Sequence, residues 1–371
     1  MPKIDAFLEL GRKQGASDIH FTVGLPPLVR VDGELSPIKY RELSREETEA
    51  MLLELLEARH RRELEERSSV DFSYESAEVG RFRVNLCRQI RGLSAVCRVI
   101  PDEVVPLEEL GLPKVLESFA ELSSGLVLVT GATGTGKSTT LAALIDRINR
   151  TRAATILTLE DPVEVLHQSQ RSLVVQRELG SDLRSFGEGL RAALRQDPDV
   201  ILVGELRDPE TISLALEASE TGHLVFGTLH TRSAAQTISR VLDVFPPEAH
   251  RQVSNTLAEN LRAVISQELV RAADGRGRRA AVEILVVTPA VARLVREGQT
   301  FKIPDLIQSG GGVGMQLMDR ALLKLVQAGE ADPDHAFELA SDKRPFLPFV
   351  TAPLSAAETA AAGARALGGG A

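Results

Sequence analysis

The stretch at 126–148, LVLVTGATGTGKSTTLAALIDRI, decides how this chain of 371 residues is interpreted. It joins a short apolar run at 126–130 to GATGTGKS at 131–138 and then to a segment with helical spacing. A G-x-x-x-x-G-K-[ST] pattern between a buried strand and a helix is the arrangement of a phosphate-binding loop. We therefore expect a nucleotide triphosphate site with ATP as its ligand, although the loop alone does not identify the base.

Each part of this loop has a physical role in holding phosphate. Glycines let the backbone turn its N–H groups inward around phosphate oxygens, and the following helix N-terminus adds partial positive charge. Lys137 is expected on the β- and γ-phosphates, and the hydroxyl of Ser138 on Mg²⁺. The predicted nucleotide-binding residues are Gly131, Ala132, Thr133, Gly134, Thr135, Gly136, Lys137 and Ser138.

Further apolar runs predict that the loop belongs to an α/β domain. They lie at 155–159, Val200–Val203 and 224–228, and helical patterns alternate with them. Continuous apolar runs are typical of parallel strands that are covered on both faces. Their alternation with helices predicts βαβ units around a central sheet.

After residue 246 the pattern becomes mainly helical, with one hairpin. A 3–4 spacing that predicts helix is kept by Val253, Leu257, Leu261, Val264 and Ile265. The hairpin is expected from 267–271 and 281–287 around a DGRG turn, and the glycines at 310–314 predict a flexible break.

Acidic residues follow two of the predicted strands. Glu160 and Asp161 come after the run at 155–159, and Glu205 follows Val200–Val203 after one glycine. In an open α/β sheet, ligands bind at the carboxyl ends of the strands, so these acids are expected beside the phosphate loop. The alternative is that they are exposed acids that simply follow strands.

Glu205 is the predicted catalytic acid, because ATP hydrolysis needs a group that orients or deprotonates water. Gly204 stands where a usual Walker-B strand has Asp. Coordination of Mg²⁺ is therefore expected from Ser138 and, through water, from Glu160 or Asp161.

Two histidines flank the run at 224–228. His223 and His230 lie at opposite ends of one predicted strand, which would hold them about 23 Å apart, so they cannot share a metal ion. His230 falls at the ligand end, where it is expected to sense the γ-phosphate or relay to Glu205. For His223 a structural and a functional role remain equally open.

The first 100 residues predict a small α+β domain with one polar sheet face. Its expected elements are a helix at 44–66 and strands at 19–23, 28–31, 81–86 and 93–99. Arg83 and Arg98 lie on these strands. From the residues alone a solvated face is preferred to the other reading, in which these arginines reach the nucleotide of a neighbouring subunit.

Composition excludes several classes of protein. Lys and Arg number 43 against 52 Asp and Glu, a net charge of −9, which disfavours nucleic-acid binding. The two cysteines exclude a disulfide scaffold and a four-cysteine zinc site. No apolar run approaches the length of about 18 residues that spans a membrane, and the first residues lack a signal-peptide core. A cytoplasmic location, peripheral to the membrane at most, is therefore expected.

Four sequence boxes occur in a fixed order along the chain. They are GATGTGKSTT at 131–140, ILTLEDPVE at 156–164, LRQDPDVILVGELRD at 194–208 and TGHLVFGTLHT at 221–231. In these boxes the chain resembles the motor ATPases of type II secretion and type IV pilus systems. Segments such as GASDIHF at 15–21 and TPAVARLVREG at 288–298 are similar to the pilus-retraction branch of that family.

The resemblance implies a homo-hexameric ring with ATP and Mg²⁺ as cofactors. Each subunit would have an N-terminal PAS-like domain at 1–100, a hinge at 101–111 and a RecA-like P-loop ATPase domain at 112–345. The tail at 346–371 does not match the family, and its Ala- and Gly-rich composition predicts disorder. The implied catalytic residues are Glu205, Glu160, His230, Arg83 and Arg98, with His223 as the other histidine of the last box. The implied function is pilus retraction and twitching motility, exerted on an inner-membrane platform protein of the pilus machine.

Several alternatives remain at this point. Assembly-type relatives carry an extra N-terminal domain and usually a four-cysteine motif, so their absence here favours the retraction type. An accessory retraction paralogue is the main alternative. It would have a regulatory role, with little turnover, in a ring that it forms with another, paralogous ATPase. A nucleic-acid translocase is disfavoured by the charge and by the scarcity of aromatic residues.

Overall fold

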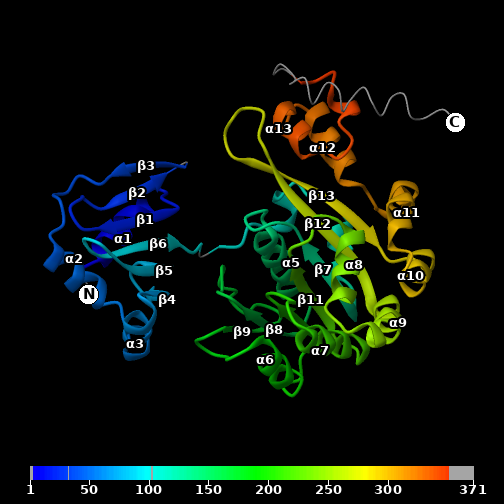
Figure 1. Cartoon of the computed structure of the whole chain (residues 1–371), viewed down its shortest axis with the longest axis horizontal. Coiled ribbons are helices and arrows are strands. Elements are labelled where there is room, and N and C mark those ends of the chain that lie inside the picture. Colours follow the sequence, from blue (N-terminus) through cyan, green and yellow to red (C-terminus); the bar gives the residue numbers. More distant parts are fainter. Residues whose placement is uncertain (1–2, 32, 102, 351–371) are drawn as a thin grey trace. The chain divides into compact units, whose positions relative to one another are not determined.

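A computed structural model describes residues 3–31, 33–101 and 103–350 of the chain. The chain divides into two compact units (Figure 1). The first contains the chain up to Glu103 together with Glu164–Leu166, and the second contains Val104–Val163 and the chain from His167 onward. Each unit has its own sheet and its own apolar core, and each is described by itself below.

The first unit is built on a six-stranded antiparallel sheet with the order β3-β2-β1-β6-β5-β4. Its strands are β1 (Asp18–Thr22), β2 (Leu28–Val31), β3 (Glu34–Pro37), β4 (Ser69–Ser76), β5 (Gly80–Gln89) and β6 (Gly92–Val99), and its helices are α1 (Asp5–Lys13), α2 (Arg45–Leu53) and α3 (Ala58–Arg67). Phe21 and Phe82 are fully buried in its core. The four predicted strands are present, while β3 and β4 were not predicted.

The single helix predicted at 44–66 is wrong, because the segment forms two helices. Ser44 caps α2, accepting a hydrogen bond from the Glu47 N–H at 3.2 Å. The helix stops at Leu53, and Arg61 of α3 donates to the carbonyl of Leu53 at 3.0 Å and to that of Leu56 at 3.3 Å. These bonds satisfy carbonyls that a continuous helix would have used itself.

The second unit contains a seven-stranded sheet with the order β13-β12-β7-β11-β10-β8-β9. The strands are β7 (Gly125–Thr130), β8 (Thr155–Glu160), β9 (Leu173–Glu178), β10 (Val200–Val203), β11 (Leu224–Leu229), β12 (Leu261–Arg271) and β13 (Arg278–Val286). All neighbouring pairs are parallel except β12 and β13, which form an antiparallel hairpin at one edge. The predicted α/β class with parallel strands is confirmed.

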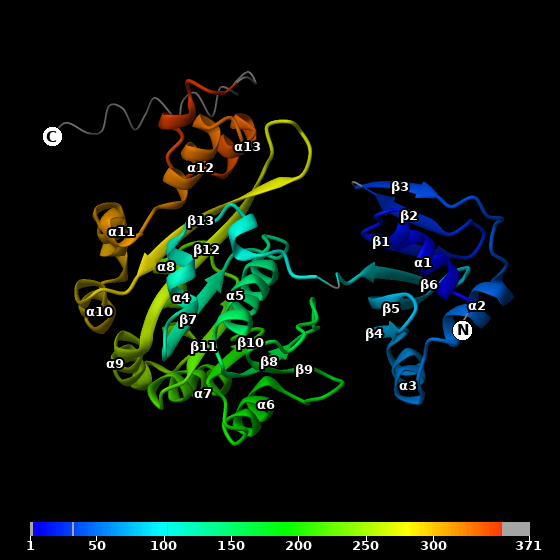
Figure 2. The same cartoon turned by 180° about the vertical axis from the view of Figure 1, so that it is seen from behind.

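Helices cover both faces of this sheet (Figures 1 and 2). One face packs against α4 (Val115–Ala120) and α5 (Lys137–Thr151). The other packs against α6 (Phe186–Ala193), α7 (Pro209–Glu220), α8 (Ala234–Asp243), α9 (His250–Asn260), α10 (Pro289–Arg296) and α11 (Ile303–Ser309). A smaller cluster, with α12 (Met318–Gln327) and α13 (Pro333–Leu339), packs against the end of the hairpin.

The helix predicted through residues 253–265 is correct only as far as Asn260. From Leu261 the chain is the strand β12, which pairs with β7. Val264 belongs to the core on one face of the sheet and Ile265 to the core on the other. A strand that is buried on both faces has an apolar pattern that periodicity cannot distinguish from a helix. The predicted hairpin is present, and the glycine break at 310–314 includes a short 3-10 helix, Gly310–Val313.

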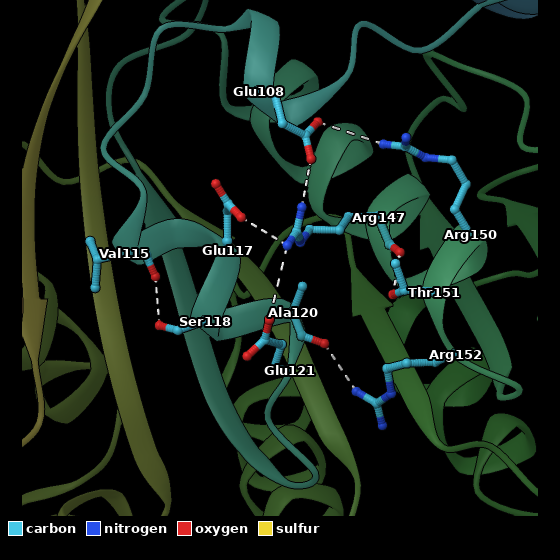
Figure 3. Close-up of polar contacts among 10 residues, drawn as sticks. All are labelled: Glu108, Val115, Glu117, Ser118, Ala120, Glu121, Arg147, Arg150, Thr151 and Arg152. Carbon is cyan, nitrogen blue, oxygen red and sulfur yellow. Dashed lines mark hydrogen bonds and ion pairs between the residues drawn. The ribbon is translucent and has the colours of Figure 1, made fainter.

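The expected hinge at 101–111 is packed over its second half. Leu107 is buried against the α5 side of the sheet. Arg147 of α5 pairs with Glu108 at 2.5 Å and with Glu117 of α4 at 2.8 Å, and Arg150 reaches Glu108 at 3.8 Å (Figure 3). These ion pairs fix the short helical turn Leu107–Glu109 on the last turns of α5.

The expected disordered tail begins within a packed segment. Phe346 is fully buried in the cluster around α12 and α13, so the prediction is wrong for residues 346–350. The rest of the expected tail, 351–371, lies outside the described residues. Within the part of the chain that the structure describes, no helix has the length and apolarity needed to cross a membrane.

Replacing Arg147 by Met should destabilise the second unit by about 1 kcal/mol, because Glu117 and Glu121 lose this cation and Glu108 keeps only its longer contact with Arg150. The measurement is thermal or urea unfolding at low salt and at about 1 M NaCl, where screening should shrink the difference. Arg293→Met is the matched control, because the exposed pair of Arg293 with Glu297 should contribute almost nothing. Equal losses for the two variants would contradict the prediction.

Candidate nucleotide-binding site

The phosphate loop lies between β7 and α5, as the sequence predicts. β7 is buried along its whole length, and α5 starts at Lys137. Gly134 and Gly136 have φ values of 83° and 85°, which glycine adopts without strain. The loop is therefore held between two rigid elements, with its backbone turned as phosphate binding requires.

Lys137 is folded back onto the loop. Its Nζ donates to the carbonyls of Gly131 at 2.9 Å and Ala132 at 2.8 Å, and the residue is 9% exposed. Thr135 donates from its hydroxyl to the same Ala132 carbonyl at 2.9 Å. The charge of Lys137 therefore lies at the mouth of the loop, while Ser138, at the start of α5, is exposed.

The neighbouring strands end within about two residues of the level at which β7 ends. Thr130 is paired with Leu229 of β11, and Val203 of β10 is paired with Gly227 of β11 and Leu159 of β8. Because all these strands are parallel, the segments that follow them emerge at one edge of the sheet, the edge formed by the carboxyl ends of the strands. The structure thus brings the phosphate loop, Glu160, Glu205 and His230 to one edge.

Glu160 is held in place at the end of β8. Its Oε1 accepts from the hydroxyl of Thr158 at 2.6 Å and from the Nε2 of Gln176 at 3.0 Å. The next residue, Asp161, is exposed. Two carboxylates therefore lie at this strand end, one of them oriented by hydrogen bonds.

Glu205 lies between two basic side chains. Its Oε2 is 2.6 Å from Nη2 of Arg207, and its Oε1 is 3.2 Å from Nε2 of His230. Burial raises the pKa of this carboxyl, but the hydrogen bond and charge of Arg207, assisted by His230, outweigh burial and hold the pKa below its usual value. Glu205 is thus a carboxylate at neutral pH and can accept a hydrogen bond from water.

Steric crowding explains why position 204 holds glycine. A Cβ there would lie 3.0 Å from the carbonyl oxygen of Leu159 and 3.3 Å from Cα of Glu160. Its own N–H donates to the Leu159 carbonyl at 2.7 Å, and the Thr228 hydroxyl donates to its carbonyl. The Asp of a usual Walker-B strand would therefore press on the backbone at the end of β8, which would have to shift to make room for its Cβ.

The two histidines have different surroundings. His230 is exposed at the same edge as Glu205, in agreement with its predicted place. His223 precedes β11 at the opposite edge, where its Nδ1 donates to the Ala218 carbonyl at 2.9 Å. The same carbonyl also accepts from the backbone N–H of His223 at 3.1 Å, so the ring adds a second bond at the end of α7, and the geometry favours the structural reading of His223.

A row of hydroxyl groups runs from β12 past the end of β7 to the segment after His230. Ser266 and Thr130 are 2.8 Å apart at their hydroxyl oxygens, Thr130 and Thr237 are 3.5 Å apart, and Thr237 and Thr231 are 2.7 Å apart. Ser266, Thr130 and Thr237 are fully buried. Sequence reasoning missed this row of hydroxyl groups, although a polar residue inside an apolar run, such as Ser266, is a signal for it.

The residues at this edge fit a hard cation. Mg²⁺ prefers oxygen ligands and keeps several waters. An exposed hydroxyl at Ser138 and carboxylates at Glu160 and Asp161 supply oxygen atoms of that kind. Among the residues described, no group of three or more His, Cys, Asp or Glu side chains forms an all-protein metal site.

Arg83 and Arg98 lie opposite each other on β5 and β6 of the first unit. Arg98 pairs with Asp18 at 2.9 Å, and Arg83 is 3.9 Å from Asp71. These four residues line a hollow of about 250 Å³ together with Asn85 and Val96. The predicted polar sheet face is therefore a concave surface on which both arginines are paired with acids.

Comparison with known proteins identifies the family. The family model described as "Type II/IV secretion system protein" matches residues 1–309. The chain belongs to this family, and the sequence resemblance is confirmed.

Within the family, the chain is similar to ATPases of type IV pili. The chain is 50% identical over 337 residues to "Type IV pilus retractation ATPase PilT" of Pseudomonas aeruginosa, covering 91% of this chain and 98% of the relative. It is 40% identical over 328 residues to "Type IV pilus ATPase PilU" of the same organism, covering 88% and 86%. A crystal structure of the pilus retraction motor PilT with bound ADP has a TM-score of 0.85 and 44% identity, covering 92% and 97%.

Replacing Gly204 by Asp, the residue of a usual Walker-B strand, should destabilise the fold. Gly204→Asp places a Cβ against the end of β8, and such overpacking should lower the free energy of unfolding by about 1–3 kcal/mol. Gly312→Ala is the control, because its Cβ would meet no atom within 4 Å. Unfolding by denaturant measures both variants, and wild-type stability of Gly204→Asp would refute the steric account.

Proposed function

We propose that the chain is an ATP-hydrolysing motor that drives retraction of type IV pili and hence twitching motility. The observation that carries the proposal is that the phosphate loop, with Lys137 folded onto it, and Glu205 follow strands that end on the same side of the sheet, and that Arg207 and His230 lie against the Glu205 carboxylate. The 50% identity to a protein named as a pilus retraction ATPase supports the type of motor.

The proposed assembly is a homo-hexamer in the cytoplasm that acts on an inner-membrane platform protein. The first unit would be the PAS-like domain and the second the RecA-like domain, with movement about the hinge, since closure around a ligand is a hinge motion. The family resemblance supports this architecture. Packing of residues 107–109 against α5 restricts the hinge to the residues before them.

Each proposed site residue has a task in hydrolysis. Lys137 and the loop N–H groups bind the phosphates, and Glu205 orients the attacking water and accepts its proton. His230, 3.2 Å from Glu205, would position that carboxylate and sense the γ-phosphate. Mg²⁺, when bound by Ser138 and through water by Glu160 or Asp161, supplies charge that stabilises the transferring phosphoryl group.

The alternative role is that of an accessory retraction paralogue. Identity is higher to PilT than to PilU of the same organism, 50% against 40%, which favours the main motor. The paired Glu205 and His230 argue against a regulator without turnover. Turnover by the purified chain alone separates a motor from such a regulator.

Deletion of the gene, with microscopy of pili, tests the proposal. Cells that keep their pili in excess and do not retract them support a retraction motor, whereas bald cells would mean assembly. Complementation by the wild-type gene is the control. Normal retraction in the deletion strain would contradict the role of main motor and would favour the accessory role.

Lys137→Ala and Glu205→Gln should fail at different steps. Removing the Lys137 charge should abolish ATP binding, because the phosphates lose their main cation. Glu205→Gln should bind ATP normally yet lose about 10²–10⁴-fold in turnover, because the amide cannot take a proton from water. Titration with a fluorescent ATP analogue and phosphate release measure the two steps. Turnover near wild type in Glu205→Gln would assign the chemistry to another residue.

Removing Arg207 should shift the pH dependence of hydrolysis. Arg207 holds the pKa of Glu205 down while burial raises it, so Arg207→Ala should let the pKa rise. Because the base must be deprotonated, the acidic limb of kcat/KM should move to higher pH. Arg207→Lys keeps the charge and serves as the control. Identical acidic limbs in Arg207→Ala and wild type would show that Arg207 does not control the pKa of the catalytic base.

Arg83→Ala should abolish hydrolysis in the assembled ring while each isolated subunit still binds ATP. The reason is that an arginine supplied by a neighbouring subunit stabilises transition-state charge, with an effect of about 10³–10⁵-fold. Arg81→Ala, on the same strand, is the control. Phosphate release at equal ring concentration is the measurement, and full activity of Arg83→Ala would return this residue to a solvated face.

A further inference from the structure

Gln267 of β12 lies against the phosphate loop and contacts it through both ends of its amide. The residue is 2% exposed. Its Nε2 donates to the carbonyl of Thr135 at 2.8 Å, and its Oε1 accepts from the hydroxyl of Thr140 at 2.8 Å. One buried side chain therefore connects the loop to the first turn of α5.

The same residue explains two glycines of the loop. A Cβ on Gly131 would lie 2.4 Å from the carbonyl oxygen of Gln267, and a Cβ on Gly136 would lie 2.8 Å from its Nε2. Real Cβ atoms do not approach other atoms so closely, because packed atoms repel steeply inside contact distance. The loop therefore rests on Gln267, and its glycines are needed for that close approach as well as for their backbone angles.

The hydrogen bond to Thr135 fixes the direction of one peptide of the loop. A peptide is planar and trans, so its C=O and N–H point in opposite directions. Because the Thr135 carbonyl points to Gln267, the N–H of Gly136 points away from β12. Phosphate binding by such a loop depends on N–H groups held in fixed directions.

We propose that Gln267 is a positioning residue for the nucleotide: its amide fixes the Thr135–Gly136 peptide so that the Gly136 N–H is presented to phosphate. This inference rests on the proposed function, because it concerns the same ATP site. Gln267 acts through the loop and not by touching the nucleotide. The hydroxyl of Thr140 holds the amide in the orientation that directs Nε2 to the loop.

The test compares the full chain with Gln267→Met, which has similar length and no hydrogen-bonding group. We expect ATP affinity, measured with a fluorescent analogue, to fall about tenfold, the effect of losing one buried hydrogen bond. Turnover at saturating ATP should change much less, because Glu205 and its partners remain. A split between KM and kcat therefore distinguishes positioning of the loop from a general loss of activity.

Gln267→Glu should make ATP affinity depend on pH. A protonated carboxyl offers one donor and one acceptor, as the amide does, whereas a carboxylate offers only acceptors and would face the Thr135 carbonyl. Burial raises the pKa of such a carboxyl, so ATP affinity should be low near about pH 8 and recover towards about pH 6. The wild type should change less over the same range.

Gln316→Met is the matched control. Gln316 is also a buried amide, 8% exposed, and it donates to the Val282 carbonyl at 2.8 Å. Its loss should lower stability without changing ATP affinity. Equal weakening of ATP binding in Gln316→Met and Gln267→Met would show a non-specific effect and overturn the inference.

Thr140 provides a second route if Gln267→Met does not fold. Thr140→Val removes the hydroxyl that anchors Oε1 and should weaken ATP binding, whereas Thr140→Ser should retain it. Equal affinities in these two variants, or a loss in Gln267→Glu that low pH does not reverse, would overturn the positioning role while the ATP site stands. A wild type that does not bind ATP would overturn the proposed function and this inference together.

Discussion

Parallel pairing of β7 with β11 and β12 is the constraint on which the candidate site depends. It sets Thr130 level with the end of β11 and brings Ser266 and Gln267 of β12 beside the loop. Because β10 and β8 continue the same pairing, their acidic ends emerge at that edge. Backbone hydrogen bonds in the core thus set where the segments of the candidate site emerge, and the residues of those segments supply its charged and polar groups.

Polar groups buried beside the loop give this part of the core a directional character. Apolar contacts are non-directional, but a buried hydroxyl or amide costs free energy unless it is hydrogen-bonded, so it selects one arrangement. Thr130, Ser266, Thr237 and Gln267 are all buried and all bonded. Apolar packing therefore holds the sheet together, while these side chains set the direction of the groups at its edge.

The α/β class and the phosphate loop could be predicted because both depend on short-range patterns: apolar runs and a glycine-rich motif. The break between α2 and α3 could not, since Arg61 satisfies carbonyls through bonds that no local pattern reveals. The change from α9 to β12 was missed for another reason, because a strand buried on both faces lacks alternation. Within the site, Glu205 and His230 were predicted from strand ends, whereas Gln267 depends on the pairing of strands more than 130 residues apart.

The surroundings of His223 bear on how mutants in TGHLVFGTLHT should be interpreted. Its ring bonds to Ala218 at one edge of the sheet, while His230 contacts Glu205 at the other. The two histidines share one sequence box, but they lie at opposite ends of one strand and contact different groups. A substitution at His223 therefore tests the contact with α7, whereas a substitution at His230 tests the contact with Glu205.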